Sequence, residues 1–258
     1  MKISIITATW NSAATVADTM ESVLRQTYAD YEHIIVDGGS TDATMDVVRA
    51  LEPSYGGRLR WVSERDRGIY DAMNKGLRMA TGDVVGILNS DDFYSSDDVL
   101  ARVAAELNCN DVDAVYGDIH YVRDTDLTRC VRYYSGRSFR RWMMLMGYQP
   151  AHPSFYCRRD VYERLGGFDL RFRIAADFEN MLRFIYMNRI RTRYLPMDFV
   201  TMRQGGTSTA GWRSHCRILS DHYRAYVKNH LPVGFVLDPA RYVMKVAEVV
   251  GGRLKGYN

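Results

Sequence analysis

The chain contains 258 residues, of which 47% are hydrophobic and 25% are charged, and its formal net charge is +3. These values are typical of an ordinary globular protein with one large α/β domain and an appendage. The four cysteines form no Cys-x-x-Cys pair, which argues against zinc and favours a reducing cytosol over a disulfide framework. No apolar run reaches the roughly 18 residues of a transmembrane helix and no signal peptide is recognisable, so we expect a cytoplasmic protein that is soluble or peripheral.

Short apolar strands alternate with amphipathic helices through the first half of the chain. The sequence predicts strands at residues 2–7, 31–36, 59–62, 84–88 and 112–116. It predicts helices with one apolar face at residues 16–24, 44–51, 69–80 and 100–107. Asn11 or Ser12 is expected to cap the first of these helices. The alternation favours a doubly wound sheet with right-handed crossovers.

The strand at residues 84–88 carries no charge and ends at Asn89-Ser90-Asp91-Asp92. An uncharged strand is typical of a sheet that helices cover on both faces, and ligands of such sheets bind beyond the carboxyl ends of the strands. Since Mg²⁺ needs only one or two carboxylates, these residues predict a metal-diphosphate site. A plain turn, followed by Ser95 and Ser96 as helix caps, explains the same residues equally well.

Two further polar clusters follow predicted strands, namely Thr7-Ala8-Thr9-Trp10 and Asp37-Gly38-Gly39-Ser40. Because the carboxyl ends of parallel strands meet at one edge of a sheet, we expect these clusters to border the same ligand crevice, where glycines permit close backbone approach. No Gly-x-Gly-x-x-Gly follows the first strand and no Walker lysine motif occurs. The sequence therefore disfavours a dehydrogenase and a P-loop NTPase.

From about residue 120 the regular alternation ends. The sequence predicts a hairpin between residues 121–122 and 130–134, a short helix at 138–146, an extended segment at 153–157 and a helix at 160–165. A helix from about Asp177, a strand at 194–202 and a loop at 205–208 follow. Amphipathic helices predicted at 212–229 and 242–250 carry basic residues, which suit either an anionic membrane surface or a solvated helix packed on the main domain.

Arginines crowd the middle of the chain, while the acids concentrate before it. The arginines concerned are Arg123, Arg129, Arg132, Arg137, Arg140, Arg141, Arg158 and Arg159. Such asymmetry indicates contact with phosphates or an anionic surface, although a solvated arginine-rich face is the commoner explanation. No nucleic-acid-binding signature is interleaved with these residues, so we expect no nucleic-acid partner.

Nine motifs distributed over residues 1–210 together resemble one protein family. They are SIITATWN at residues 4–11, QTY at 26–28, EHIIVDGGSTD at 32–42, DRGIYDAMNKG at 66–76, LNSDD at 88–92, HPSF at 152–155, GFD at 167–169, DFE at 177–179 and GGTS at 205–208. The family is the inverting family two glycosyltransferases with the GT-A fold, related to enzymes that assemble bacterial surface polysaccharides. Residues 211–258 have no comparable support.

The resemblance implies a Rossmann-like, mostly parallel sheet flanked by helices. Residues 1–210 would form the GT-A domain, divided into a nucleotide-sugar-binding half at 1–118 and an acceptor-binding half at 119–210. Residues 211–258 would form a helical extension. The implied reaction moves a sugar from a nucleotide diphosphate sugar to the hydroxyl of a glycan or lipid-linked glycan, with inversion. A catalytically silent nucleotide-sugar-binding or scaffold protein is the alternative, and a nucleotidyltransferase ranks third because its glycine- and arginine-rich signature is missing.

The resemblance also assigns residues to the donor. The nucleobase would be bordered by Thr7, Ala8 and Trp10, while Asp37 would accept one of its N–H groups, as an ionised carboxylate can. Asp66 would lie along the same pocket. Asn74 or Lys75 would lie near the sugar or the phosphates, although a surface position on a regular helix also explains Lys75.

The remaining assignments concern the metal and the chemistry. Asp91 matches the last position of the family's Asp-x-Asp metal motif for Mg²⁺ or Mn²⁺, whereas Asn89 replaces the first aspartate, so binding would depend mainly on Asp91. Asp177 matches the general base, and an ordinary helix cap is the alternative explanation. His152 would contact the acceptor or the phosphates, or serve as a structural histidine. We expect peripheral membrane contact if the acceptor is presented at the inner face of the membrane.

Overall fold

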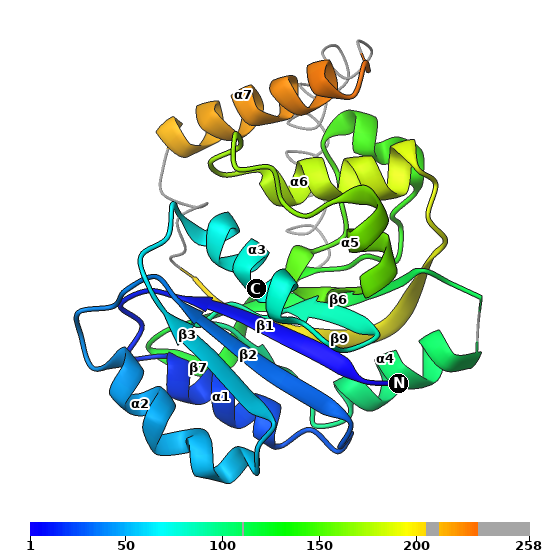
Figure 1. Cartoon of the computed structure of the whole chain (residues 1–258). Helices are drawn as coiled ribbons and strands as arrows, with labels where there is room; N and C mark the ends of the chain where they lie inside the picture. Colours follow the sequence, from blue (N-terminus) through cyan, green and yellow to red (C-terminus); the bar gives the residue numbers. More distant parts are fainter. Residues whose placement is uncertain (110, 205–211, 232–258) are drawn as a thin grey trace.

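A computed structural model describes residues 1–109, 111–204 and 212–231 (Figure 1). Its strands are β1 (Ile3–Thr9), β2 (Tyr31–Asp37), β3 (Leu59–Ser63), β4 (Val84–Ile87), β5 (Phe93–Tyr94), β6 (Ala114–Arg123), β7 (Asp126–Tyr134), β8 (Phe155–Arg158) and β9 (Thr192–Arg203). The α-helices are α1 (Val16–Leu24), α2 (Thr44–Leu51), α3 (Ile69–Met79), α4 (Val99–Cys109), α5 (Arg159–Leu165), α6 (Ala176–Met181) and α7 (Trp212–Lys228). Three 3₁₀ turns, η1 (Glu52–Tyr55), η2 (Arg141–Met146) and η3 (His152–Ser154), and a π-helical turn, η4 (Leu182–Met187), complete the described elements.

All of these strands belong to one mixed sheet with the order β3-β2-β1-β4-β8-β6-β9-β5, and β7 pairs with β6 as a hairpin. The strands of the first half, β3, β2, β1 and β4, run parallel to one another. β8 is inserted antiparallel between β4 and β6, and β6 runs parallel to β9. The sheet therefore combines a Rossmann-like parallel half with a mixed half.

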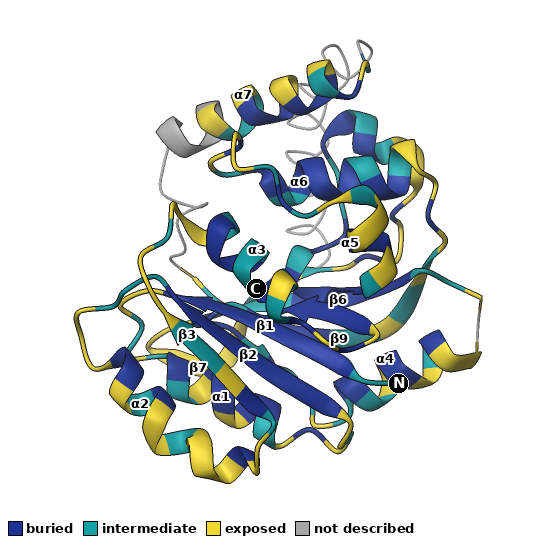
Figure 2. Ribbon diagram, viewed as in Figure 1, coloured by how far each residue is buried: buried dark blue, intermediate teal, exposed yellow. Residues whose placement is uncertain are grey.

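Helices cover both faces of the sheet. In Figure 1, α1, α2 and α4 lie on one face, and α3, α5, α6 and α7 lie on the other. Because successive side chains of a strand point to opposite faces, Ile3 and Ile5 of β1 join the core under α1 and α2, whereas Ile6 and Ala8 join the core under α3. Figure 2 shows the consequence: β1 and β2 are buried along their length, while the helices are exposed on their outer faces.

The junction between the two halves depends on a glycine. Gly86 of β4 faces the ring of Tyr156 on β8, and a Cβ atom built on Gly86 would lie 2.1 Å from Tyr156 Cε1. Any larger residue would push β8 away from β4. The Tyr156 hydroxyl in turn forms a short hydrogen bond with the Tyr94 hydroxyl of β5, so one side chain connects three strands across the sheet.

The structure differs from the sequence predictions at several places. Neither Asn11 nor Ser12 caps α1 with its side chain; instead the Ser12 carbonyl accepts hydrogen bonds from the backbone of Thr15 and Val16. β6 is one continuous strand with bulges, where the sequence suggested a strand followed by a separate hairpin segment. β5 is too short to produce a periodic signal and was not predicted.

The C-terminal region is described only as far as residue 231. The predicted helix at 212–229 is present as α7, whose buried Ala225 and Tyr226 pack in the same core as α6. Lys228, one of the basic residues of this helix, pairs with Asp169 and Glu179, each at 2.8 Å, and is therefore not simply solvated. The predicted loop at 205–208 and helix at 242–250 lie outside the described residues. Among the residues described, no helix is long and apolar enough to cross a membrane.

Candidate functional site

The three polar clusters predicted at the strand ends lie side by side. The amide of Gly38 donates to the Thr9 carbonyl at 2.9 Å, which joins the loop after β2 to the end of β1. The amide of Asn11 donates to Ser40 Oγ at 2.7 Å, and the hydroxyls of Ser12 and Ser90 are 2.9 Å apart. The loops after β1, β2 and β4 therefore form one continuous edge.

The end of β1 contributes residues of two kinds. Thr7 is fully buried, and its hydroxyl pairs with His33 Nε2 at 2.9 Å. Burial lowers the pKa of His33 to about 3, so this contact involves a neutral imidazole. Ala8 is also buried, whereas the Trp10 side chain is 66% exposed at the edge of the loop. Trp10 is thus the one of these residues that offers an open aromatic surface.

The Asp37 loop is shaped by its own carboxylate. Asp37 is buried and accepts hydrogen bonds from the amides of Gly39 and Ser40, at 3.2 and 3.0 Å, and from the hydroxyl of Ser63 at 2.6 Å. The Ser40 hydroxyl also donates to it in a short bond. These donors fix the loop that the sequence assigned to the nucleobase.

Asp66 lies against the Asp37 loop. A Cβ atom on Gly38 would lie 2.6 Å from Asp66 Oδ2, so only glycine permits this approach. Asp66 Oδ1 accepts a hydrogen bond from the amide of Gly68 at 2.8 Å, immediately before α3 begins. The structure therefore brings together two aspartates that are distant in sequence and were both assigned to the nucleoside pocket.

The loop after β4 contains oxygen atoms without donors. Asp92 is buried and accepts a hydrogen bond from Asn89 Nδ2 at 3.0 Å. Asn89 Oδ1 and Asp92 Oδ1 are also buried, and neither has a hydrogen-bond partner among the described residues. Burial raises the pKa of Asp91, while burial and the neighbouring charge of Asp91 raise the pKa of Asp92. Buried acceptors without donors cost free energy, which a cation would recover.

These oxygens fit a divalent cation. Mg²⁺ and Mn²⁺ prefer hard oxygen ligands, and Mg²⁺ typically takes one or two carboxylates together with water and phosphate oxygens. Asp91, only partly buried, is the carboxylate of this loop that remains accessible. Within the described ranges, no group of three or more His, Cys, Asp or Glu side chains could hold an ion without further ligands. A metal here would complete its coordination with water and phosphate oxygens.

Arg203, at the end of β9, neighbours this loop and was not singled out from the sequence. Its Nε donates to the Asp91 carbonyl at 3.1 Å, and its guanidinium also pairs with Asp18 and Asp124. The side chain is only 9% exposed. Arg203 thus ties β9 to the loop after β4, and no local sequence motif marks it because its partners come from three other segments.

Asp177 lies at the start of α6 and is held by both of its oxygens. Tyr70 Oη is 3.0 Å from Oδ1, and Gln149 Nε2 donates to Oδ2 at 2.9 Å. The Tyr70 hydroxyl also lies within short hydrogen-bond distance of the Ile174 carbonyl, so its single proton is shared between two acceptors. Tyr70 belongs to α3, four residues after Asp66, so it connects the donor side of the edge to Asp177. The sequence motif contained Tyr70 but gave no reason to select it, and Gln149 lies outside the motifs.

His152 and Asn74 occupy the same neighbourhood in different ways. His152 is half-buried beside Phe168, with the two rings edge to face at 5.5 Å. Burial lowers the pKa of His152, while the nearby Asp177 carboxylate acts in the opposite direction. The Asn74 amide makes two hydrogen bonds of 2.8 Å with the backbone of Phe168. Asn74 therefore positions the loop that carries Phe168.

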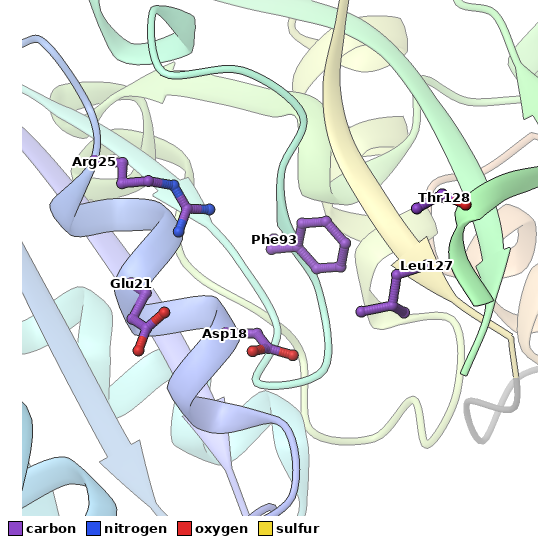
Figure 3. A pocket seen from close by; sticks show the side chains of 6 residues that line it. All are labelled: Asp18, Glu21, Arg25, Phe93, Leu127 and Thr128. Carbon is purple, nitrogen blue, oxygen red and sulfur yellow. The ribbon is translucent and has the colours of Figure 1, made fainter. Parts of the chain in front are cut away.

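Two cavities lie outside this edge. One of about 230 Å³ lies between α1 and the β6–β7 hairpin, where Asp18, Glu21 and Arg25 face Phe93 and Leu127 (Figure 3). The other, of about 500 Å³, lies between α3 and α5 and includes Asn74 and Phe168 in its lining. Lys75 points away from both, because its Nζ binds the Arg65 carbonyl and Glu64 at 2.9 Å.

The chain is similar to known proteins in sequence. The model of the family described as "Glycosyl transferase family 2" matches residues 4–166. A PGL/p-HBAD biosynthesis glycosyltransferase of Mycobacterium tuberculosis is 36% identical over 204 residues, which cover 79% of this chain and 77% of the relative. An uncharacterized glycosyltransferase of the same species is 35% identical over 182 residues, covering 70% of this chain and 68% of the relative.

Solved structures share the fold at lower identity. S. aureus TarS in complex with UDP superposes with a TM-score of 0.64 at 18% identity, covering 88% of this chain and 66% of that one. A mannosyltransferase from Pyrobaculum calidifontis in complex with GDP-Man and Mn²⁺ superposes with a TM-score of 0.65 at 22% identity, covering 99% of this chain and 81% of that one. The sheet and its helices therefore have the GT-A arrangement of these proteins.

Proposed function

Because the chain belongs to glycosyl transferase family 2, we propose that it transfers a sugar from a nucleotide diphosphate sugar to a hydroxyl group of a glycan or lipid-linked glycan, with inversion and with the help of a divalent metal. The observation that carries this proposal is the arrangement around Tyr70. Its α3 begins beside Asp66 on the donor side, and its hydroxyl contacts Asp177, the predicted base. Donor and acceptor chemistry would then share one edge of the sheet.

Donor binding would use the loops after β1, β2 and β3. Trp10 offers an exposed aromatic face for a nucleobase. The Asp37 loop is bonded to the residues on either side of Trp10, through Gly38 to Thr9 and through Ser40 to Asn11. Asp66 lies within contact distance of Gly38 and would face the ribose or base from the opposite side. Thr7 and Ala8, both buried, would support this pocket from beneath. On this division, residues 1–118 hold the donor and residues 119–210 hold the acceptor.

The leaving diphosphate would lie at the loop after β4. Asp91, with the amide oxygen of Asn89 nearby in the same loop, would hold Mg²⁺ or Mn²⁺, which when bound neutralises charge on the diphosphate. The Mn²⁺ complex of the Pyrobaculum mannosyltransferase supports the use of a divalent metal. Burial raises the pKa of Asp91, and protonation of this carboxylate competes with metal binding. Metal affinity should therefore fall as the pH is lowered.

Asp177 would act as the general base. It would take the proton of the acceptor hydroxyl while that oxygen bonds to the anomeric carbon and the bond to the diphosphate breaks. Tyr70 and Gln149 would keep the carboxylate oriented during the displacement. His152 would contact the acceptor beside Asp177, since the two side chains interact electrostatically. Asn74 would act indirectly, through the Phe168 loop that packs against His152.

For the acceptor we propose only a chemical class. The mycobacterial relative is named for PGL/p-HBAD biosynthesis, which supports a role in building a surface glycoconjugate. We place the enzyme in the cytoplasm, at the inner face of the membrane when it meets a lipid-linked acceptor.

One assay tests the proposal directly. The protein is incubated with a panel of nucleotide sugars, with Mg²⁺ or Mn²⁺, and with hydroxyl-bearing acceptors, and release of the nucleoside diphosphate is measured. We expect acceptor-stimulated release that EDTA abolishes. If the protein bound nucleotide tightly but showed neither sugar transfer nor slow donor hydrolysis under any condition, it would be a catalytically silent binding protein.

A further inference from the structure

A long segment of the chain carries only positive charge. Residues 127–159 contain seven arginines and not one aspartate or glutamate. The segment includes β7 apart from its first residue, Asp126, together with the turn η2 and strand β8. Two of the arginines are structural: Arg158 donates to the carbonyls of Leu107 and Val112, and Arg159 pairs with Glu163. The other five lie in β7 and in the residues that follow it.

These five arginines are exposed and lack acidic partners. They are Arg129, Arg132, Arg137, Arg140 and Arg141. None of them forms an ion pair with any acid in the described part of the chain. Arginines on the outer helices behave differently: Arg49 pairs with Asp46 and Arg102 with Asp98, both at 3.1 Å, and Arg164 pairs with Asp160 at 3.4 Å. Within β7, hydrogen bonds from Thr128 and the charge of Arg129 lower the pKa of Asp126, and the Tyr133 hydroxyl donates to Asp118 at 2.8 Å. The uncompensated positive charge is therefore that of Arg137, Arg140 and Arg141, which follow β7.

Two large aromatic side chains are exposed in the same segment. Tyr133 is 54% exposed on β7, and Trp142 is 57% exposed at the start of η2. Trp and Tyr are the side chains that favour the boundary between lipid and water, because an apolar ring carries a polar group. Arginines beside them would meet lipid phosphates. We refer to Arg129, Arg132, Tyr133 and residues 137–142 as the basic aromatic surface.

The strand β7, which carries part of the basic aromatic surface, also contacts the acceptor side of the site through Tyr134. The Tyr134 hydroxyl, next to Tyr133 in β7, donates to the Gln149 carbonyl at 2.7 Å. Gln149 Nε2 then donates to Asp177 at 2.9 Å. Two hydrogen bonds and the Gln149 residue between them therefore connect β7 to the predicted base. The helix α7 fits this role less well, because Arg224 and Lys228 are both paired with acids.

We propose that the basic aromatic surface docks the protein on an anionic lipid bilayer and so presents Asp177 to an acceptor held in that bilayer. The part concerning the acceptor rests on the proposed function, whereas docking itself does not. Charge complementarity selects the occupant: an uncompensated cationic patch with exposed Trp and Tyr matches a surface of phosphate groups above an apolar layer.

The experiment is co-sedimentation with vesicles of phosphatidylcholine alone or with phosphatidylglycerol. The test variant is the triple substitution Arg137→Gln, Arg140→Gln and Arg141→Gln. Its matched control, Arg49→Gln, Arg102→Gln and Arg164→Gln, removes the same charge from paired arginines. We expect wild type and control to bind only phosphatidylglycerol vesicles, and the test variant to bind on the order of 100-fold more weakly. Trp142→Ala should weaken binding less, and to a similar degree at low and high salt.

Three outcomes would overturn the proposal. They are no preference of wild type for phosphatidylglycerol, an equal loss in the control, or release from vesicles by millimolar glycerol phosphate, which would indicate a pocket for a soluble phosphate. Thermal unfolding and donor hydrolysis should be the same in all three proteins, since none of the substituted residues lies in the site. If wild type released no nucleotide at all, the proposed function would fail while the vesicle result still stood.

Discussion

The pKa values of buried carboxylates are shifted in opposite directions at the two ends of the parallel strands. At the amino edge, Glu32 accepts hydrogen bonds from Ser4 Oγ at 2.7 Å, the Thr81 amide at 2.6 Å and Lys2 Nζ at 3.0 Å. Burial opposes its ionisation, but these donors outweigh burial and lower the pKa of Glu32 to about 2. At the carboxyl edge, burial prevails and raises the pKa of Asp91 and Asp92.

The difference separates stability from function. A carboxylate that the fold surrounds with donors holds elements together, whereas one left short of donors is available to a ligand that supplies positive charge. Asp177 lies between these two cases in the number and charge of its partners. It is bound by two neutral side chains, Tyr70 and Gln149, and by no cation among the residues that the structure describes. Substitution of the carboxylates that lack donors should therefore affect turnover most, whereas substitution of Glu32, which is surrounded by donors, should affect stability alone.

The largest expected effect on activity is that of Asp91→Asn. Loss of the anionic ligand should abolish metal-dependent binding of nucleoside diphosphates, a change of about 10³-fold or more. Stability should be unchanged or slightly higher, because burial disfavours the ionised carboxylate. Calorimetry with and without Mn²⁺ measures the binding, and Asp97→Asn, an exposed aspartate a few residues later, is the control. Normal binding by Asp91→Asn would refute the metal assignment.

Asp177→Asn comes next. A positioned general base contributes roughly 10²- to 10⁴-fold to the rate, so turnover should fall by that factor while donor affinity stays the same. Thermal unfolding distinguishes this role from helix capping, which would lower stability and activity together. If Asp177→Asn kept near-normal turnover, another residue would have to be the general base. Glu179 is unsuitable because it is paired with Arg183 and Lys228, so the role would fall to His152.

Tyr70→Phe should have a smaller effect that reveals its mechanism. Loss of one hydroxyl next to Asp177 should lower kcat about tenfold without changing donor affinity. Donor affinity is measured beside kcat, so that a loss confined to kcat identifies an effect on the carboxylate and not on nucleotide binding. Tyr28→Phe, whose hydroxyl binds the Met1 carbonyl, is the control. An unchanged kcat would leave Tyr70 with a packing role only.

Glu32→Gln should affect turnover least and stability most. The pKa of Glu32 is about 2 in the fold against 4.5 ordinarily, so its ionised form contributes about 3 kcal/mol near neutral pH. Because the folded pKa is depressed, this contribution is complete above about pH 5 and disappears as the pH falls toward 2. Denaturant unfolding at pH 7 and pH 3 should show the variant less stable at pH 7 and closer to wild type at pH 3.

Periodicity was sufficient to place most of the elements. Strands such as β1 and β2 combine uncharged faces with polar ends, and α3 repeats small and apolar residues every three or four positions, so both patterns depend on local sequence alone. The insertion of β8 between β4 and β6 could not be predicted in this way. Its four residues pair with strands about 40 and 70 positions earlier, and only the fit of Tyr156 over Gly86 selects them.

The same distinction applies to the site. Asp37, Asp91 and Asp177 each follow or begin a predicted element, so their positions could be read from local patterns and from the family resemblance. Gln149 and Arg203 could not, because their partners are 28 and 112 residues away in sequence and neither belongs to a local motif. Asn74 shows the reverse case, where a motif residue turns out to bind the backbone of Phe168.

The position of β8 also constrains how the chain can be made. During synthesis, β4 emerges from the ribosome well before β8, and until residue 158 arrives its outer edge has no partner. An unpaired apolar edge invites pairing with other chains, so nascent protein should depend on chaperones or on rapid completion of the second half. For the same reason, a truncated fragment ending near residue 118 should aggregate, and the proposed donor-binding half is best studied within the whole chain.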